Sequence, residues 1–296
     1  MRSKRKPKDG IQRVLSDYLE LTKPPIMFLL LITASGGMFL AQSGVPDLWL
    51  MLAVWLGGAT ASGGASALNH YWDRDIDLLM ARTSDRPVAA KRISGPAAIT
   101  FGISLNIISM VVLLLWANWL AAVLTLGATL FYVVIYTMWL KRTTPQNIVI
   151  GGAPGAIPPV VGWVAVTGTF DLSALFLFCI VFFWTPAHFW ALSLMIEKDY
   201  EQVKIPMLSV VAPIDYTVLS IFLYTVIVVA LTIVFAFTGV TGIVYLVCAV
   251  VMGGIFMYFA WQLKKTHSLV KARHQYLYSL LYLMVLFCSL MVDSVI

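Results

Sequence analysis

Charged residues are scarce in this chain, and their scarcity limits what the protein can be. Only 11% of the 296 residues are Asp, Glu, Lys or Arg, whereas 60% are hydrophobic and the mean hydropathy is +0.88. A soluble domain needs a charged surface, so this composition excludes an ordinary soluble protein. Repeated apolar runs of about 20 residues instead place the chain among proteins that cross a membrane several times.

Several motifs of soluble proteins are also absent from the sequence. It contains no GxGxxG or Walker A sequence and no HExxH pair of histidines. Cys179, Cys248 and Cys288 all fall in apolar runs without CxxC spacing, so neither a disulfide framework nor a zinc site is expected. The first 24 residues are basic but lack the apolar core of a signal peptide, so a cleaved leader is not expected either.

Nine apolar runs are long enough to span a bilayer, and we expect an all-α bundle of nine transmembrane helices. The expected domain covers residues 25–296 and follows a basic segment over residues 1–24. The predicted spans are residues 25–42, 48–68, 97–116, 119–140, 148–166, 172–196, 216–238, 240–262 and 276–292.

The basic residues predict the orientation of this bundle. Seven of the 20 precede the first span, and the other 13 lie in alternate loops, after spans two, four, six and eight. By the positive-inside rule the N-terminus is cytoplasmic and the C-terminus is outside, as in a bacterial-type plasma membrane. These basic loops on one side of the membrane account for the pI near 9.2, so we expect no nucleic-acid partner. The longer polar loops place the functional site on the cytoplasmic side.

The most informative charges follow the second span, in the sequence NHYWDRDIDLLMARTSDR. If the helix continues, Asn69, Asp73 and Asp77 are spaced i, i+4 and i+8 on one face, while Asp75 points elsewhere. Carboxylates held on one face repel, so the pattern indicates a divalent cation, and oxygen ligands suit Mg²⁺ that bridges to substrate phosphates. A solvated helix end with assorted charges is the alternative interpretation.

Basic residues near the acidic motif and after the fourth span are candidates for binding phosphate. Arg82 and Arg86 follow the motif, and Lys141 and Arg142 close the fourth span. The planar arginine side chain donates two parallel hydrogen bonds to phosphate oxygens, so these residues are candidate ligands of a diphosphate. The alternative is that they only set the orientation of the loops.

The sixth span contains a histidine and ends in a loop with charged residues. His188 lies in an aromatic stretch inside the span, where an ionisable residue is a functional candidate, with a packing role as the alternative. Asp199 is expected to present a carboxylate to the first acidic cluster, and Lys198 is a candidate substrate ligand. Glycine and proline crowd residues 151–162, which predicts a broken fifth span beside a substrate chamber, or else close packing of small residues.

Three stretches of the chain resemble a known family. NHYWDRDIDLLMARTSDRP resembles the first aspartate-rich motif of the UbiA superfamily of intramembrane prenyltransferases. YTMWLKRTTPQNIVIGGAPGAIPPVVGW and WTPAHFWALSLMIEKDYEQVKIPML resemble the members of that superfamily that farnesylate heme. The resemblance covers roughly residues 20–295, and it implies nine helices around a central cavity that opens to membrane lipid.

The resemblance also implies an activity and roles for individual residues. Farnesyl diphosphate would bind through Mg²⁺, and its farnesyl group would pass to a vinyl group of heme B to give heme O. Asn69, Asp73 and Asp77 carry over as the catalytic first motif, and Asp199 carries over to the second, where Met195 replaces an expected aspartate. The implied metal ligands are Asp73, Asp77 and Asp199. The proposed substrate ligands are Arg82, Arg86, Lys141, Arg142, His188 and Lys198.

Other interpretations stay open at this point. Within the superfamily the acceptor could be 4-hydroxybenzoate, a naphthoate or a chlorophyll precursor. A transporter would need charged residues in mid-span, and the spans are almost free of them apart from His188. We further predict that His188 orients heme, that Trp184, Phe189 and Trp190 wall the site, and that a terminal oxidase or heme A synthase is a possible partner.

Overall fold

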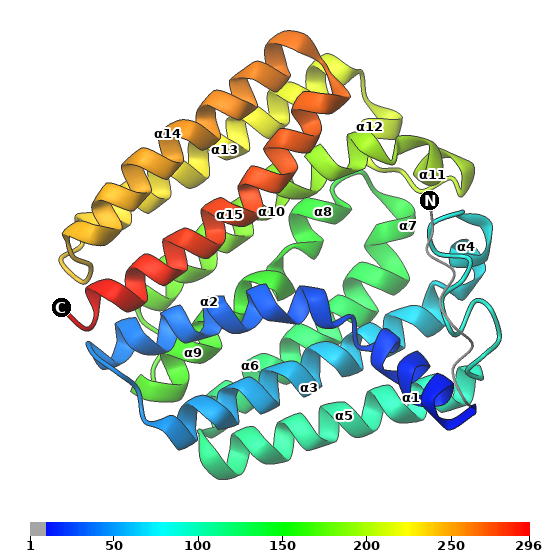
Figure 1. The fold of residues 1–296 in the computed structure, drawn as a ribbon, viewed down its shortest axis with the longest axis horizontal. Coiled ribbons are helices and arrows are strands. Elements are labelled where there is room, and N and C mark those ends of the chain that lie inside the picture. The colour runs from blue at the N-terminus through cyan, green and yellow to red at the C-terminus, as the bar shows by residue number, and fades with distance from the viewer. Residues whose placement is uncertain (1–9) are drawn as a thin grey trace.

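The structure is a computed structural model that describes residues 10–296 as one bundle of helices (Figure 1). Nine segments of the described chain are long and apolar enough to cross a membrane, which confirms the predicted spans to within a few residues at most ends. Their bounds are Pro24–Gln42 (α2), Leu48–Trp72 (α3), Gly95–Trp116 (α5), Trp119–Thr143, Asn147–Thr167, Leu172–Met195 (α10), Ile214–Ala236 (α13), Ile243–Thr266 (α14) and Leu269–Asp293 (α15).

Within residues 10–296, four short helices lie outside these spans. They are α1 (Gly10–Leu21), α4 (Arg74–Leu79), α11 (Glu197–Gln202) and α12 (Leu208–Val211). The basic residues Arg2, Lys4, Arg5, Lys6 and Lys8 of the predicted N-terminal segment lie outside the described residues.

Several spans begin with a hydrogen bond from a backbone N–H group to an Asp side chain. These capped starts lie at the end of the bundle where the connections are short. Asp47 accepts a hydrogen bond from the backbone N–H of Leu50 at the start of α3, and Asp171 accepts one from Ser173 at the start of α10. Asp293 accepts from three backbone N–H groups where α14 begins. The three carboxylates at this end therefore satisfy exposed helix N-termini.

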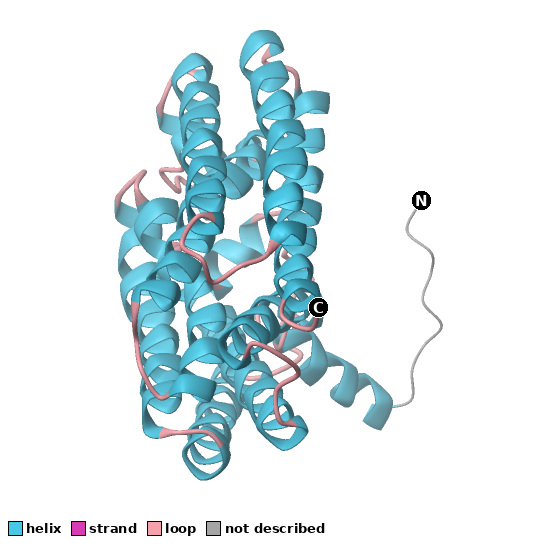
Figure 2. Ribbon diagram, turned by 90° about the vertical axis from the view of Figure 1, so that its left-hand side faces the viewer, coloured by secondary structure: helices cyan, strands magenta, loops and turns pink. Residues whose placement is uncertain are grey.

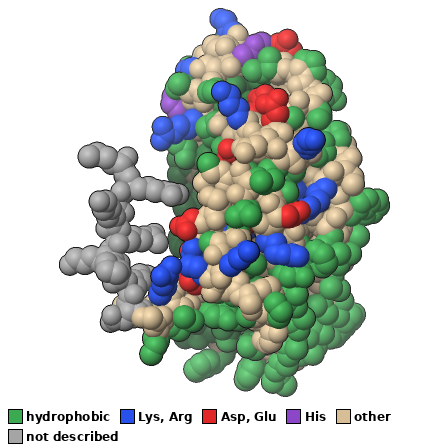
Figure 3. All heavy atoms as spheres, turned by 90° about the vertical axis from the view of Figure 1, so that its right-hand side faces the viewer, with side chains coloured by type: hydrophobic (Ala, Val, Ile, Leu, Met, Phe, Trp, Pro, Cys, Tyr) green, Lys and Arg blue, Asp and Glu red, His purple; other side chains and the backbone are tan. Residues whose placement is uncertain are grey.

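The helices form two groups that meet along the middle of the bundle. In one group α3 packs on α5 and α2 on α9, and in the other α10, α13, α14 and α15 pack together (Figures 1 and 2). Contacts of α2 with α15 and of α9 with α10 join the groups. The loops that carry Lys and Arg share one end of the bundle, where blue and red side chains gather in Figure 3. All candidate polar residues of the site come from this end or the helices just beneath it.

Two spans depart from regular α-helix beside the centre of the bundle. The fifth is broken, as predicted, into α8 (Asn147–Gly151), a 3₁₀ turn η2 (Ala153–Ala156) and α9 (Ile157–Thr167). The fourth consists of α6 (Trp119–Leu130), a π-helix η1 (Phe131–Leu140) and the single turn α7 (Lys141–Thr143). Irregular backbone at this depth is tolerated where it lines a cavity or functional site.

Glycine allows α2 and α9 to cross in direct backbone contact. A Cβ added to Gly162 would overlap the carbonyl group of Ala34, and one added to Gly37 would overlap the carbonyl oxygen of Pro159. The two glycines are therefore required by close helix packing, as small residues are in other membrane bundles.

Gly162→Ala should destabilise the protein by about 1–3 kcal/mol, because a methyl group would push two backbones apart. Gly127→Ala is the matched control, since Gly127 lies in α6 with open space around its Cα. Thermal unfolding in detergent at one scan rate should show a lower midpoint only for Gly162→Ala. Equal midpoints for the two variants would contradict the packing argument.

Candidate active site

The acidic motif bridges the end of α3 and the start of α4. Asp73 lies between the two helices, and its N–H donates to the carbonyl of Asn69 at 2.9 Å, while the N–H of Asp77 donates to the carbonyl of Asp73 at 2.8 Å. The i to i+4 spacing is thus kept through the junction. Asn69, Asp73 and Asp77 are buried, whereas the side chain of Asp75 is 59% exposed, as the spacing predicted.

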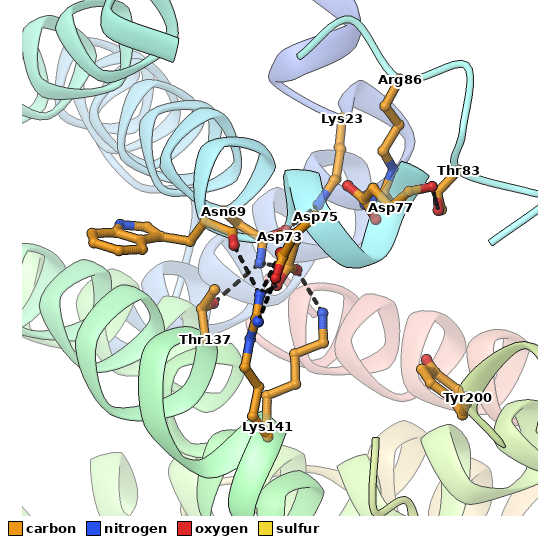
Figure 4. A network of polar contacts seen from close by, with 12 residues as sticks. Lys23, Asn69, Asp73, Asp75, Asp77, Thr83, Arg86, Thr137, Lys141 and Tyr200 are labelled. Atoms are coloured by element: carbon orange, nitrogen blue, oxygen red, sulfur yellow. Dashed lines mark hydrogen bonds and ion pairs between the residues drawn. The ribbon is translucent and has the colours of Figure 1, made fainter. Parts of the chain in front are cut away.

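Asp73 is the centre of a buried polar network (Figure 4). Its Oδ2 accepts hydrogen bonds from Nδ2 of Asn69 at 2.8 Å and from Nζ of Lys141 at 2.5 Å. Asn69 also donates to Oγ1 of Thr137 at 3.1 Å. The π-helix η1 carries Thr137, and Lys141 follows directly after it, so the fourth span supplies two partners of the motif.

Asp77 is held by the segment that follows α4. Nη1 of Arg86 lies 2.8 Å from both of its carboxylate oxygens, and Oγ1 of Thr83 donates to its backbone carbonyl at 3.0 Å. A carboxylate that is 1% exposed needs such a counter-charge, because an unpaired buried charge is costly. Arg86 therefore lies beside the motif, and its role as a phosphate ligand stays a prediction.

Lys23 is a site residue that sequence reasoning missed. It takes a left-handed backbone conformation (φ 50°) between α1 and α2, and its Nζ donates to Oδ1 of Asn69 at 3.0 Å. Burial and the nearby Arg86 guanidinium lower the pKa of Lys23 to about 7. The available signal is its place directly before the Pro-Pro start of the first span, whereas the charge pattern alone assigns Lys23 only to the orientation of the bundle.

Asp199 lies in a second polar group. Nε of Arg82 pairs with its Oδ2 at 3.2 Å, and Nη2 of Arg82 donates to the hydroxyl of Tyr200 at 3.4 Å. Burial raises the pKa of that hydroxyl, so Tyr200 is neutral and able to donate at ordinary pH. The structure thus joins Arg82 to Asp199, two residues 117 positions apart that the sequence assigned to the same site.

Of two other predicted ligands, Arg142 lies at the edge of the network around Asp73 and Lys198 lies outside both groups. Arg142 makes hydrogen bonds at 2.7 Å to both carboxylate oxygens of Asp75, and its guanidinium lies 3.9 Å from Asp73. The Arg142 hydrogen bonds lower the pKa of Asp75 to about 2, so this pair is ionised. Lys198 is exposed and makes no hydrogen bond or ion pair with the described residues of either group.

An apolar cavity of about 650 Å³ lies at the centre of the bundle, next to the network. Small side chains of α3 line one wall, and the broken fifth span lines another, which confirms that it flanks a chamber. Its aromatic and ionisable lining residues are Lys23, Tyr132, Tyr136, Trp184, His188, Phe189 and Tyr276. Lys23 thus connects the cavity with Asn69 and the acidic motif.

The aromatic wall is only partly as predicted. Trp184 and Phe189 line the cavity, but Trp190 does not, and it packs instead on Tyr224 with ring centroids 5.3 Å apart. The prediction for Trp190 was wrong because it follows Trp184 by six residues, which turns it to another face of α10.

His188 lines the cavity in a fixed orientation. Its ring is stacked between Trp184 and Tyr276, with centroids 4.3 and 4.8 Å away. Nδ1 lies 2.7 Å from Oγ of Ser279, which donates its own proton to the carbonyl of Tyr276. Ser279 therefore accepts from Nδ1–H, and Nε2 is the ring nitrogen left with a lone pair.

The acidic residues fit a metal ion only in part. In the described part of the chain no three Asp, Glu, His or Cys side chains are grouped closely enough to hold one metal ion, and Asp73, Asp77 and Asp199 each pair with a different basic residue. Asp73 Oδ1, however, is buried without a hydrogen-bond partner. Mg²⁺ commonly binds through one or two carboxylates plus substrate phosphates, so Asp73 and Asp77 are a fitting donor set.

Solved structures share this arrangement of helices. A structure of digeranylgeranylglyceryl phosphate synthase matches with a TM-score of 0.79 at 18% identity, covering 95% of this chain and 98% of that one. A UbiA homologue from Archaeoglobus fulgidus bound to GPP and Mg²⁺ matches with a TM-score of 0.62 at 15% identity, covering 93% and 99%. The fold and site define an intramembrane helical protein that places buried polar residues beside an apolar chamber.

The family follows from the sequence match. The UbiA prenyltransferase family matches residues 30–287, so the chain belongs to this family. A Roseiflexus sp. protein called protoheme IX farnesyltransferase is 45% identical over 97% of this chain, which spans only 54% of that relative. A Gloeobacter violaceus protein of the same name is 47% identical over 96% of this chain and 94% of its own length. The chain thus spans about half of the Roseiflexus relative and nearly all of the Gloeobacter one.

Proposed function

We propose that this protein transfers the farnesyl group of farnesyl diphosphate to a vinyl group of heme B and so makes heme O. The observation that carries the proposal is the identity of about 45% along nearly the whole chain to proteins called protoheme IX farnesyltransferase. The site supports it, because a polar network beside an apolar cavity suits a substrate with a charged head and a hydrocarbon tail.

The diphosphate would bind among the basic side chains around the acidic motif. Lys23, Arg86 and Lys141 each contact a residue of that motif, and Arg82 adds a guanidinium from the second group. Charge-assisted hydrogen bonds from these groups would stabilise the negative charge that develops on the leaving diphosphate. Asn69 would orient Asp73, to which it donates.

Asp73 and Asp77 would hold Mg²⁺ against the diphosphate, and Asp199, which pairs with Arg82, would face the diphosphate from the second motif. A bound Mg²⁺ supplies Lewis-acid stabilisation of the leaving group. The buried Asp73 Oδ1 without a hydrogen-bond partner is the feature of this chain that favours a cation there. The A. fulgidus structure, which carries GPP and Mg²⁺, supports the same chemistry by fold.

The proposed reaction joins three reactants and releases diphosphate. The C1–O bond of farnesyl diphosphate breaks, and its electron pair leaves with the diphosphate. The vinyl carbon of heme B then bonds to C1, and water adds to the resulting cation and loses a proton, which gives the hydroxyethylfarnesyl group. Trp184, Phe189 and Tyr132 would stabilise the allylic cation and limit premature hydrolysis, since aromatic faces attract cations.

We also propose a membrane location and a protein partner. All Lys and Arg residues fall at one end of the bundle or in the segment before it, which favours a plasma membrane with the site on the cytoplasmic side. A terminal oxidase or heme A synthase is the proposed partner, since such proteins use the product class.

The experiment is to incubate the purified protein with heme B, farnesyl diphosphate and Mg²⁺ and to separate the hemes by chromatography. A heavier, more apolar heme with the mass of heme B plus one farnesyl group and one hydroxyl group is the expected product. If heme B stays unchanged and 4-hydroxybenzoate or a naphthoate is prenylated, the acceptor is an aromatic acid and the proposal is overturned.

Lys23 should make substrate affinity depend on pH. Its ammonium is charged below about pH 7 and neutral above, so the Kd for farnesyl diphosphate should rise as pH increases through 7. Lys23→Arg keeps its charge and should bind with little change from pH 7 to 9, whereas Lys23→Met should bind weakly throughout. Equilibrium binding at several pH values measures this. A Kd that rises with pH in Lys23→Arg as it does in the wild type would contradict the prediction.

A further inference from the structure

Helix α1 has an apolar face that the described structure leaves open. Ile11, Val14, Leu15 and Leu19 are 78%, 52%, 66% and 61% exposed, and their spacing places them on one side of the helix. Arg13 lies on another side. With 12 residues α1 is too short to cross a bilayer, so this face is suited to the membrane surface.

The position of α1 fits such a surface location. In Figure 2 it projects sideways from the bundle instead of packing among the spans. The ring of Tyr18 contacts that of Phe101 with centroids 4.9 Å apart. Phe101 is six residues inside α5, about 9 Å along it, so α1 packs beside the first two turns of that span.

The charge before and within α1 indicates which lipids it would meet. Five of the first eight residues are basic, and Arg13 adds a sixth basic residue in the helix itself. Basic residues beside an amphipathic helix bind anionic headgroups, and each contributes to attraction toward an anionic leaflet. The partner favoured by this chemistry is an anionic phospholipid surface.

Two contacts link α1 to the candidate active site. Nε of Arg92 donates to both carboxylate oxygens of Asp17, at 3.0 and 3.1 Å, and Nη1 of Arg92 pairs with Asp85 at 2.9 Å. Asp85 immediately precedes Arg86, the partner of Asp77. At its other end, α1 leads within two residues to Lys23, which donates to Asn69.

We propose that α1 docks on anionic phospholipid and that this docking holds the Arg92 and Lys23 contacts in place, so that catalysis depends on the lipid. The amphipathic helix then acts as a positioning element for the diphosphate end of the site. The effect on turnover rests on the proposed function, whereas lipid docking itself does not.

Hydrogen exchange provides a test of docking that needs no substrate. The protein is reconstituted in vesicles of phosphatidylcholine alone or mixed with phosphatidylglycerol, and exchange of residues 10–21 is followed by mass spectrometry. Slower exchange of these amides in the anionic vesicles is expected for the wild type and is lost in Leu15→Glu/Leu19→Glu. Equal exchange in both lipids would overturn the proposal, even if the enzyme proves to have another acceptor.

Turnover in the same vesicles tests the link to the site. Wild-type turnover should be several-fold higher in anionic vesicles, and Leu15→Glu/Leu19→Glu should lose that gain. Gln12→Glu is the control for added charge alone, because it places one carboxylate at an exposed polar position at the border of the apolar face, removes no apolar side chain and should keep most of the gain. Lipid-independent crosslinking of two α1 helices would assign the face to a second copy of the chain and overturn docking on lipid.

Discussion

Asp73→Asn should lower turnover by about a hundredfold or more, because Asp73 is the proposed metal ligand at the centre of the buried network. The substitution keeps the shape of the side chain and removes its charge. It also leaves the buried Lys141 ammonium without its carboxylate, so some loss of stability is expected as well. Turnover with heme B should therefore be measured on protein that elutes as a single folded species in detergent.

Asp75→Asn is the matched control for this experiment. It makes the same chemical change two residues away, at a side chain that is 59% exposed and pairs with Arg142. We expect a change of less than about tenfold in turnover, since exposed ion pairs contribute little. If Asp75→Asn lowered turnover as much as Asp73→Asn, both results would follow from a general loss of charge in this segment. The metal-ligand role of Asp73 would then be contradicted.

His188→Ala should abolish the visible spectrum of bound heme while farnesyl diphosphate still binds. The expectation follows from the stacked ring of His188, whose Nδ1 donates to Ser279 and whose Nε2 is left for a ligand. A neutral imidazole with one nitrogen fixed by a hydrogen bond is a common ligand of heme iron. Absorption spectra with heme B, recorded beside diphosphate binding, measure the two properties separately.

His274→Ala is the control for the heme experiment, because His274 is exposed near the start of α15. Its spectrum should equal that of the wild type. Ser279→Ala should shift the heme spectrum without removing it, since it takes away only the hydrogen bond that fixes the ring. A His188→Ala protein with an unchanged spectrum would reject ligation and leave His188 with a packing role between Trp184 and Tyr276.

The spans were predictable because continuous apolar sequence and basic loops alternate along the whole chain. The last helix was the exception, since it begins at Leu269 and not near residue 276. Lys271 and Arg273 suggested a loop there, but a helix can extend beyond the apolar layer with its charges in water. Similarly, α1 was hidden in a segment treated only as basic, although Ile11, Leu15 and Leu19 have helical spacing.

The site was predictable where neighbouring positions in one helix decide the geometry. Asn69, Asp73 and Asp77 share a buried face because of their four-residue spacing. Pairings between distant segments could not be predicted in the same way. The partner of Arg142 is Asp75, and that of Asn69 is Lys23, because those pairs depend on how α2, α3 and the π-helix η1 pack in space.

The ion pairs around the acidic motif have a consequence for overall electroneutrality. When Lys23 is protonated, the described network and the second polar group together contain one more cation than anions. The cations are Lys23, Arg82, Arg86, Lys141 and Arg142, and the anions are Asp73, Asp75, Asp77 and Asp199. A diphosphate that arrives with a divalent cation carries a small net negative charge. Its entry would therefore neutralise the surplus, and basic side chains would exchange carboxylate partners for phosphate oxygens without leaving bare charge in a low-dielectric interior.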